Sequence, residues 1–286
     1  MKIIDIIKQS KPSLSFEVFP PKALDGFEGV SQAINEIAKL SPSFMSVTYG
    51  AGGGTSQYTA KIAEQLSSLG VTSLAHLTCI SSTKDEVNNQ IRTLKNLGIE
   101  NILALRGDIT HDKYINNLDF KYAFELIDEI KKNGDFCIGG ACYPECHPES
   151  INIETDIIHL KNKVDHGCEF LTTQMFFDND IYYRFNELAQ NNGIDVPIVA
   201  GIMPITSLSQ INKMVAISGN ELPKKFLDLL SKYEHDPVSL KQAGIYYSID
   251  QARDIYEKGY NAVHIYSMNK PEVAKQIQTA LMDVIK

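Results

Sequence analysis

Short apolar runs rich in β-branched and aromatic residues recur along the chain and are separated by segments with a different hydrophobic period. The segments between most of the runs repeat apolar residues at i, i+3, i+4 and i+7, which predicts amphipathic helices, and several of them end at a glycine. The apolar runs themselves are expected to form eight strands, at residues 14–19, 44–50, 73–79, 101–107, 137–144, 169–177, 196–204 and 261–268.

Strand and helix alternate with a period of about 30 residues, as in parallel βαβ units. Eight such repeats in 286 residues predict an α/β fold of the (β/α)8 TIM barrel type, because a doubly wound sheet usually stops earlier. Residues 205–260 hold more helical pattern than one crossover needs, so extra helices are expected between strands seven and eight. No linker rich in Pro, Gly or Ser interrupts the pattern, which predicts a single barrel domain over residues 1–286.

Composition and charge limit the kind of function. The chain is 43% hydrophobic and 22% charged, enough to bury a large core, and its net charge of -8 argues against nucleic-acid and anionic-membrane partners. Small-molecule chemistry is favoured instead. Five cysteines in a chain with this much core do not suggest a disulfide framework. Since the sequence also lacks a signal peptide and any apolar stretch long enough to cross a membrane, we expect a cytoplasmic protein.

The first strand carries a candidate general acid. Alternation along LSFEVF places Leu14, Phe16 and Val18 on one face and Glu17 on the other, so Glu17 points into the barrel if the apolar face meets the helices. A buried carboxylate is costly unless it is paired or protonated, and burial raises its pKa toward that of a usable acid. The structural alternative is an ion pair with Arg106 or with a lysine.

Other strand ends carry weaker signals. Asp108 follows the fourth strand, where it is either functional or a helix cap, and the amide of Gln174 shares a face with Thr172 on the sixth strand, as a ligand group or a core residue. The glycine run at residues 50–56 lacks the Lys-Ser or Lys-Thr pair of a phosphate loop, so a tight turn near a ligand is the better interpretation.

The stretch CYPECHPES at residues 142–150 raises the question of a metal site. It places Cys142, Cys146 and His147 close together, and thiolate and imidazole are ligands that zinc prefers. The residue types alone leave a zinc site open.

Seven motifs then resemble one family when they are taken together. SFEVFPPK, SVTYGAGG, HLTC, LRGD, YPECHPES, KVDHGCEFLTTQMFFD and PIVAGIMPI occur in this order, one per successive strand, and closely resemble the methylenetetrahydrofolate reductases over roughly residues 14–270. The resemblance implies a flavin enzyme of one-carbon metabolism and methionine supply, in its short form with the catalytic barrel alone. It also implies that residues 142–150 are a flavin loop and that no metal is bound there.

The resemblance assigns site residues as follows. Glu17 is the acid that opens the five-membered ring of methylenetetrahydrofolate, and Asp108 stabilises the developing cation. The folate would be bound by Asp108, Gln174 and Lys270. FAD would be bound by Thr48, His76, Arg106, Gly107, Asp108, Tyr122, Ala123, Tyr143, His147, Pro148, Glu149, Ser150, Asp156, His159 and Lys163.

The resemblance also implies ping-pong hydride transfer, in which NADH reduces FAD and the folate then binds over the same flavin face. Some bacterial members carry a phenylalanine that packs on nicotinamide and folate where this chain has Leu208. Leucine cannot stack, so NADPH and a ferredoxin-type protein donor stay open as alternatives.

Two hypotheses from other classes are a zinc-thiolate methyltransferase barrel and a non-catalytic folate- or flavin-binding barrel, and the second would not need Glu17. The sequence does not indicate the oligomeric state, and a homo-oligomer stays possible. It also does not indicate which polyglutamate length of the folate is preferred.

Overall fold

Eight parallel strands form a closed barrel in the computed structural model, each strand pairing with its neighbours in the sequence and β8 pairing with β1. The structure describes residues 1–21, 26–49, 56–80, 82–108, 119–218 and 222–285. All eight predicted strands are confirmed. They are β1 (Ser13–Val18), β2 (Met45–Val47), β3 (Ser73–Thr78), β4 (Asn101–Leu105), β5 (Cys137–Cys142), β6 (Phe170–Thr173), β7 (Ile198–Ile202) and β8 (Ala262–Ile265).

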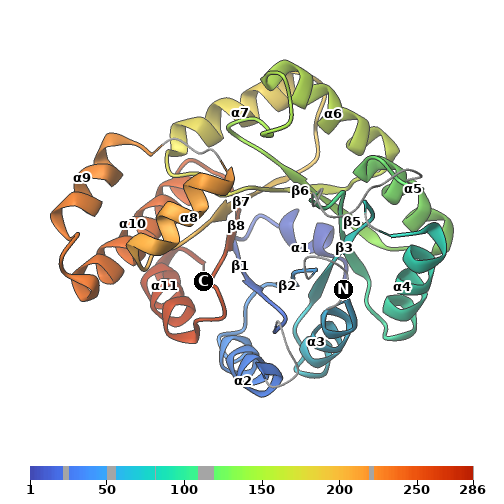
Figure 1. The fold of residues 1–286 in the computed structure, drawn as a ribbon, viewed down its shortest axis with the longest axis horizontal. Helices are drawn as coiled ribbons and strands as arrows, with labels where there is room; N and C mark the ends of the chain where they lie inside the picture. Colours follow the sequence, from blue (N-terminus) through green and yellow to red (C-terminus); the bar gives the residue numbers. More distant parts are fainter. Residues whose placement is uncertain (22–25, 50–55, 81, 109–118, 219–221, 286) are drawn as a thin grey trace.

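A ring of helices surrounds the strands (Figure 1), which confirms the predicted (β/α)8 architecture. The ring consists of α2 (Phe27–Ala38), α3 (Ser56–Ser68), α4 (Lys84–Asn96), α5 (Ala123–Asn133), α6 (Ile153–His166), α7 (Asn179–Asn191), α10 (Pro237–Glu257) and α11 (Pro271–Ile285). The main core lies between the barrel wall and these helices, because the strands bury an apolar residue outward at every second position.

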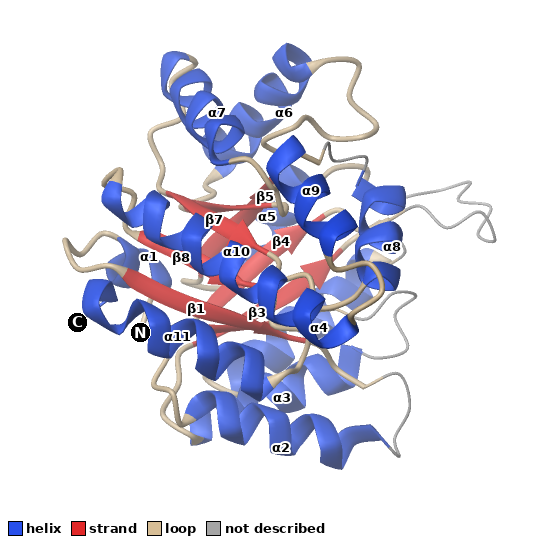
Figure 2. Ribbon diagram, turned by 90° about the vertical axis from the view of Figure 1, so that its left-hand side faces the viewer, coloured by secondary structure: helices blue, strands red, loops and turns tan. Residues whose placement is uncertain are grey.

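The described residues form three further helices that do not belong to that ring. The short α1 (Ile3–Ile7) buries Ile3, Ile4 and Ile7 against side chains of the barrel interior such as Leu74 and Phe170. The extra helices predicted between strands seven and eight are confirmed as α8 (Leu208–Ser218) and α9 (Lys224–Lys232). Figure 2 shows them on the side of the barrel opposite α1. Within the described residues, no helix is long and apolar enough to span a membrane.

Strand register brings distant polar residues together inside the barrel. Glu17 of β1 is the register partner of Ser46 on β2, and Ser15, two residues earlier on β1, is the partner of His264 on β8. Register partners in neighbouring strands point to the same side of the sheet. All four side chains therefore enter the barrel interior in two adjacent layers.

Candidate active site

A cavity of about 950 Å³ opens among the C-terminal ends of the strands. Its walls include residues that follow the strands, such as Phe19, Tyr143, Gln174 and Met203. This is the end of a (β/α)8 barrel that holds active sites, and the volume lies within the range of small-molecule pockets. The cavity is therefore the candidate active site.

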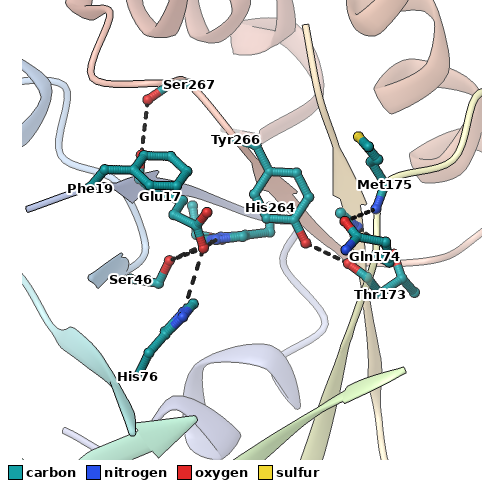
Figure 3. Close-up of polar contacts among 12 residues, drawn as sticks. Glu17, Phe19, Ser46, His76, Thr173, Gln174, Met175, His264, Tyr266 and Ser267 are labelled. Atoms are coloured by element: carbon teal, nitrogen blue, oxygen red, sulfur yellow. Dashed lines mark hydrogen bonds and ion pairs between the residues drawn. The ribbon is translucent and has the colours of Figure 1, made fainter. Parts of the chain in front are cut away.

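Glu17 points into this cavity, as the alternation along β1 predicted. Its side chain is 9% exposed, and Figure 3 shows its carboxyl group between Ser46, His76 and His264. The Oε2 atom lies 3.2 Å from Ser46 Oγ and 3.5 Å from His76 Nε2. The alternative of an ion pair with Arg106 is wrong, because both terminal guanidinium nitrogens of Arg106 donate to Glu149 at 2.6 Å.

The carboxyl group and the imidazoles beside it are neutral at pH 7. Burial raises the pKa of Glu17 to about 8, against a smaller lowering by the hydrogen bond with Ser46. Burial lowers the pKa of His76 to about 3, and burial together with the neighbouring His76 lowers the pKa of His264 to about 3. The contacts of Glu17 with the two histidines, at 3.5 and 4.0 Å, are therefore not ion pairs, although charged groups at these distances would form them. Glu17 is therefore a protonated carboxylic acid beside two neutral imidazoles.

Two buried polar atoms in the cavity wall have no hydrogen-bond partner among the described residues. They are His76 Nε2 and Thr172 Oγ1, and both residues line the cavity. A buried polar atom without a partner costs about 1–3 kcal/mol, so these atoms are suited to bind a polar ligand. A flavin ring or a pterin carries the donors and acceptors that they require.

The remaining predicted substrate residues occupy different places. Gln174 lines the cavity, and its Oε1 accepts from the backbone N–H of Met175 at 3.0 Å (Figure 3), which orients the amide. Lys270 donates to Thr206 Oγ1 at 2.6 Å. Asp108 is exposed beyond the end of β4 and is not among the described residues that line the cavity. Residues 50–55 of the predicted ligand turn lie outside the described residues.

Comparisons with known proteins agree with the barrel and its motifs. The family model for methylenetetrahydrofolate reductase matches residues 2–282. The chain belongs to the methylenetetrahydrofolate reductase family. It is 33% identical to the 5,10-methylenetetrahydrofolate reductase of Escherichia coli (strain K12), over 94% of this chain and 90% of that protein. It is also 33% identical to methylenetetrahydrofolate reductase (NADH) 1 of Arabidopsis thaliana, over 94% of this chain.

The chain spans about half the length of this plant reductase, 49% of it. Among solved structures, an uncharacterized protein from Clostridium thermocellum that binds two copies of 5-methyl-5,6,7,8-tetrahydrofolic acid has a TM-score of 0.67 to this chain. The two are 16% identical, with 98% of this chain and 99% of the other covered. At that identity, the likeness shows a shared fold.

Residues that the reductase motifs assign to FAD lie in the cavity wall and on the elements that follow β4 and β5. Thr48, His76 and Tyr143 line the cavity. The others lie on the loops after β4 and β5 and on α5 and α6, and are Arg106, Gly107, Asp108, Tyr122, Ala123, His147, Pro148, Glu149, Ser150, Asp156, His159 and Lys163.

Contacts between some of these residues join the separate elements. Asp156 of α6 accepts from the backbone N–H of His147 at 2.9 Å and from Ser150 Oγ at 3.2 Å. Tyr122 stacks on His159 at 6.2 Å, which joins α5 to α6. The Tyr122–His159 contact connects two different βα units, so the sequence did not indicate it.

The two cysteines within residues 142–150 are in surroundings that disfavour metal binding. Burial raises the pKa values of the Cys142 and Cys146 thiols, whereas a zinc ligand must be a thiolate. His147 Nδ1 accepts from the backbone N–H of Glu149 at 3.0 Å. No group of three or more His, Cys, Asp or Glu side chains with the geometry of a metal site occurs in the part of the chain that the structure describes.

The loop after β8 holds the end of β1 in place, which the sequence pattern did not indicate. Asn269 Oδ1 accepts from the backbone N–H of Phe19 and its Nδ2 donates to the Phe19 carbonyl, both at 2.8 Å. Ser267 Oγ donates to the Glu17 carbonyl at 3.1 Å (Figure 3). Met268 and Asn269 both have φ of 54°, a left-handed conformation that Asn tolerates better than most residues. Asn269 thus extends the pairing of β8 with β1 beyond the strands.

Asn269→Ala is expected to lower the free energy of unfolding by about 1–2 kcal/mol, because it removes two part-buried hydrogen bonds. Urea unfolding measures the change. Asn269→Gly is the matched control, since glycine adopts a φ of 54° freely but also lacks the amide. Full stability of the glycine variant would show that backbone conformation, and not the two hydrogen bonds, gives Asn269 its effect.

Proposed function

We propose that the protein reduces 5,10-methylenetetrahydrofolate to 5-methyltetrahydrofolate, with FAD as bound hydride carrier and NADH as hydride donor. Glu17 carries the proposal, because it is a buried carboxyl group that retains its proton at pH 7 and faces the cavity. Membership of the reductase family supports the folate as substrate. The volume of the cavity and the unpartnered His76 Nε2 and Thr172 Oγ1 are compatible with a flavin ring and a pterin bound in succession.

Bound FAD would accept a hydride from NADH and deliver it to the one-carbon unit of the folate. Thr48, His76 and Tyr143 are the candidates for contact with its ring system, since all three line the cavity. Arg106 is a candidate for its pyrophosphate. Because Glu149 now holds the guanidinium at 2.6 Å, that pair has to open first.

Glu17 would supply the proton that the folate needs. Opening the five-membered ring leaves a nitrogen that must be protonated, and a buried acid with a pKa of about 8 is protonated at pH 7 and releases its proton readily. Gln174, held by Met175, would bind the pterin edge through its amide. Lys270 would meet the glutamate tail, and Asp108 would approach the substrate from the exposed end of β4. These two assignments rest on the family motifs.

The choice of hydride donor would depend on the side chains around α8. Leu208 packs at the start of that helix on the apolar cluster that contains Met203 and Phe226, and Met214 of the same helix lines the cavity. A methionine side chain is apolar and adaptable, so Met214 can pack on a nicotinamide ring where stacking by residue 208 is absent.

Anaerobic absorbance spectroscopy of the FAD-loaded protein tests the proposal. NADH is expected to bleach the flavin absorption, and methylenetetrahydrofolate is expected to restore it. A flavin that NADH and NADPH leave oxidised would move the donor to a redox protein. Bleaching without recovery on the folate would point to a binding barrel or another acceptor, and failure to bind FAD would overturn the proposal.

A further inference from the structure

A line of hydrogen bonds runs from Glu17 into the barrel wall. Glu17 Oε2 lies 3.2 Å from Ser46 Oγ, which lies 3.0 Å from His264 Nε2. His264 Nδ1 lies 2.7 Å from Ser15 Oγ, and Ser15 Oγ lies 3.1 Å from the Val263 carbonyl oxygen. The four residues are at most 7% exposed, so they must satisfy their polar atoms largely with one another.

The directions of these bonds follow from the Ser15 hydroxyl, which donates to the Val263 carbonyl at 3.1 Å. A carbonyl oxygen only accepts, so the single hydroxyl proton of Ser15 goes to Val263, and Ser15 Oγ accepts from His264 Nδ1–H. A neutral imidazole carries one proton, and His264 is neutral, so its Nε2 is an acceptor. Ser46 then donates its hydroxyl proton to Nε2 and accepts in turn from the protonated Glu17. In the opposite direction Ser46 would donate to a Glu17 carboxylate, and that bond is the one that lowers the pKa of Glu17.

We infer that His264, acting through Ser46, is a positioning residue that keeps the proton on Glu17. The inference rests on the proposed function of Glu17 as the acid. A hydrogen bond accepted from the neutral carboxyl group favours that form, whereas a hydroxyl that donates to Glu17 favours the carboxylate. The tautomer of His264 thus decides whether Ser46 raises or lowers the acidity of Glu17.

The rings around His264 hold its imidazole in one plane. Phe44 stacks on it with ring centroids 5.5 Å apart and planes 9° apart, and Tyr266 meets it edge-on at 5.4 Å and 87°. The hydroxyl of Tyr266 donates to the Thr173 carbonyl (Figure 3). These contacts fix the plane of the ring, and within that plane Nδ1 faces Ser15 and Nε2 faces Ser46.

The other titratable groups near Glu17 do not replace Ser46 as the acceptor of its proton. Burial keeps His76 neutral and raises the pKa of Tyr266. His76 Nε2 lies 3.5 Å from Glu17 Oε2, beyond the 3.2 Å of the Ser46 contact. Tyr143 and Lys213 line the same cavity, and the variants proposed below do not alter either residue.

The pKa of Glu17 in the resting protein tests the inference. Infrared spectroscopy follows the carbonyl band of the protonated carboxyl group, assigned by its loss in Glu17→Gln. His264→Leu and Ser46→Ala are each expected to lower the pKa of Glu17 by about one pH unit, because the first turns the Ser46 hydroxyl toward Glu17 and the second removes the acceptor. Ser267→Ala is the control, since its hydroxyl donates to the backbone carbonyl of Glu17 and not to its carboxyl group, and no change is expected.

An unchanged or raised pKa in both variants would overturn the inference, because it would mean that Ser46 donates to Glu17. Nitrogen NMR of the unaltered protein gives a second result that no folding defect can obscure. A proton on His264 Nδ1 supports the inference, and a proton on Nε2 overturns it. Neither measurement uses turnover, so the two proposals can fail separately. If the inference about His264 is wrong, Glu17 can still be the acid. If Glu17→Gln is active, the pKa results for His264 and Ser46 still hold.

Discussion

Glu17→Gln is expected to abolish most folate reduction, with a loss of about 100- to 10,000-fold in turnover, while NADH still bleaches the bound flavin. Glutamine fills nearly the same volume and keeps a contact with Ser46, but it has no proton to give to the departing nitrogen. Only the folate step requires that proton. Stopped-flow absorbance measures the reduction and the reoxidation of the flavin separately, and an unchanged rate of reoxidation would contradict the acid role.

The pKa of Glu17 also sets the sign of two pH dependences. Reoxidation by the folate should decline as pH rises through about 8, where the acid loses its proton. A raised pKa also means that the folded protein holds the proton more tightly than the unfolded chain does. The contribution of Glu17 to stability is therefore complete below its ordinary pKa of 4.5 and is lost as pH rises through about 8. Glu17→Gln should be at least as stable as the unaltered protein at neutral pH, so a folding defect would not explain its inactivity.

A matched control for this substitution is Glu129→Gln. Glu129 is also a buried carboxylate, but it belongs to α5 and contacts Lys84 at 3.4 Å and Lys132 at 3.3 Å. It lies outside the described lining of the cavity. We expect its replacement to affect stability and to leave both flavin steps unchanged.

Gly244→Ala is expected to destabilise the fold by about 3 kcal/mol, which corresponds to a melting temperature lower by about 5–10 °C. Gly244 lies within α10, and a Cβ there would stand 1.8 Å from the Ile205 carbonyl oxygen. That atom belongs to the backbone after β7, so relief requires the helix and the end of the barrel to move apart. The cavity should widen with them, because Met203 in the same segment lines it.

Gly29→Ala is the matched control in α2, where a Cβ would meet nothing within 4 Å. There the same substitution should stabilise the protein by about 0.5–1 kcal/mol, because alanine loses less backbone freedom in a helix than glycine does. Thermal unfolding measures both variants. A neutral Gly244→Ala would mean that α10 does not approach Ile205 this closely in solution.

The hydrophobic pattern along the chain determined the eight strands, the helices between them and the inward direction of Glu17. These features are local, because the period of two in a strand and the period of about 3.6 in a helix depend only on neighbouring residues. The excess of helical pattern in residues 205–260 likewise predicted α8 and α9. The seven ordered motifs were enough for the resemblance to a family that the comparison then confirmed.

Only the tertiary structure shows which side chains surround Glu17. Ser46 is 29 residues from Glu17, and His264 is 218 residues from Ser46, so only barrel closure and strand register bring the three together. The pairing of β4 with β5 places Arg106 beside Glu149, so Arg106 forms its ion pair there and Glu17 stays protonated. Local periodicity shows which face of a strand a residue occupies. Which side chain from another strand lies beside it depends on how all eight strands close, and that choice sets the burial and the hydrogen bonds from which the acidity of Glu17 follows.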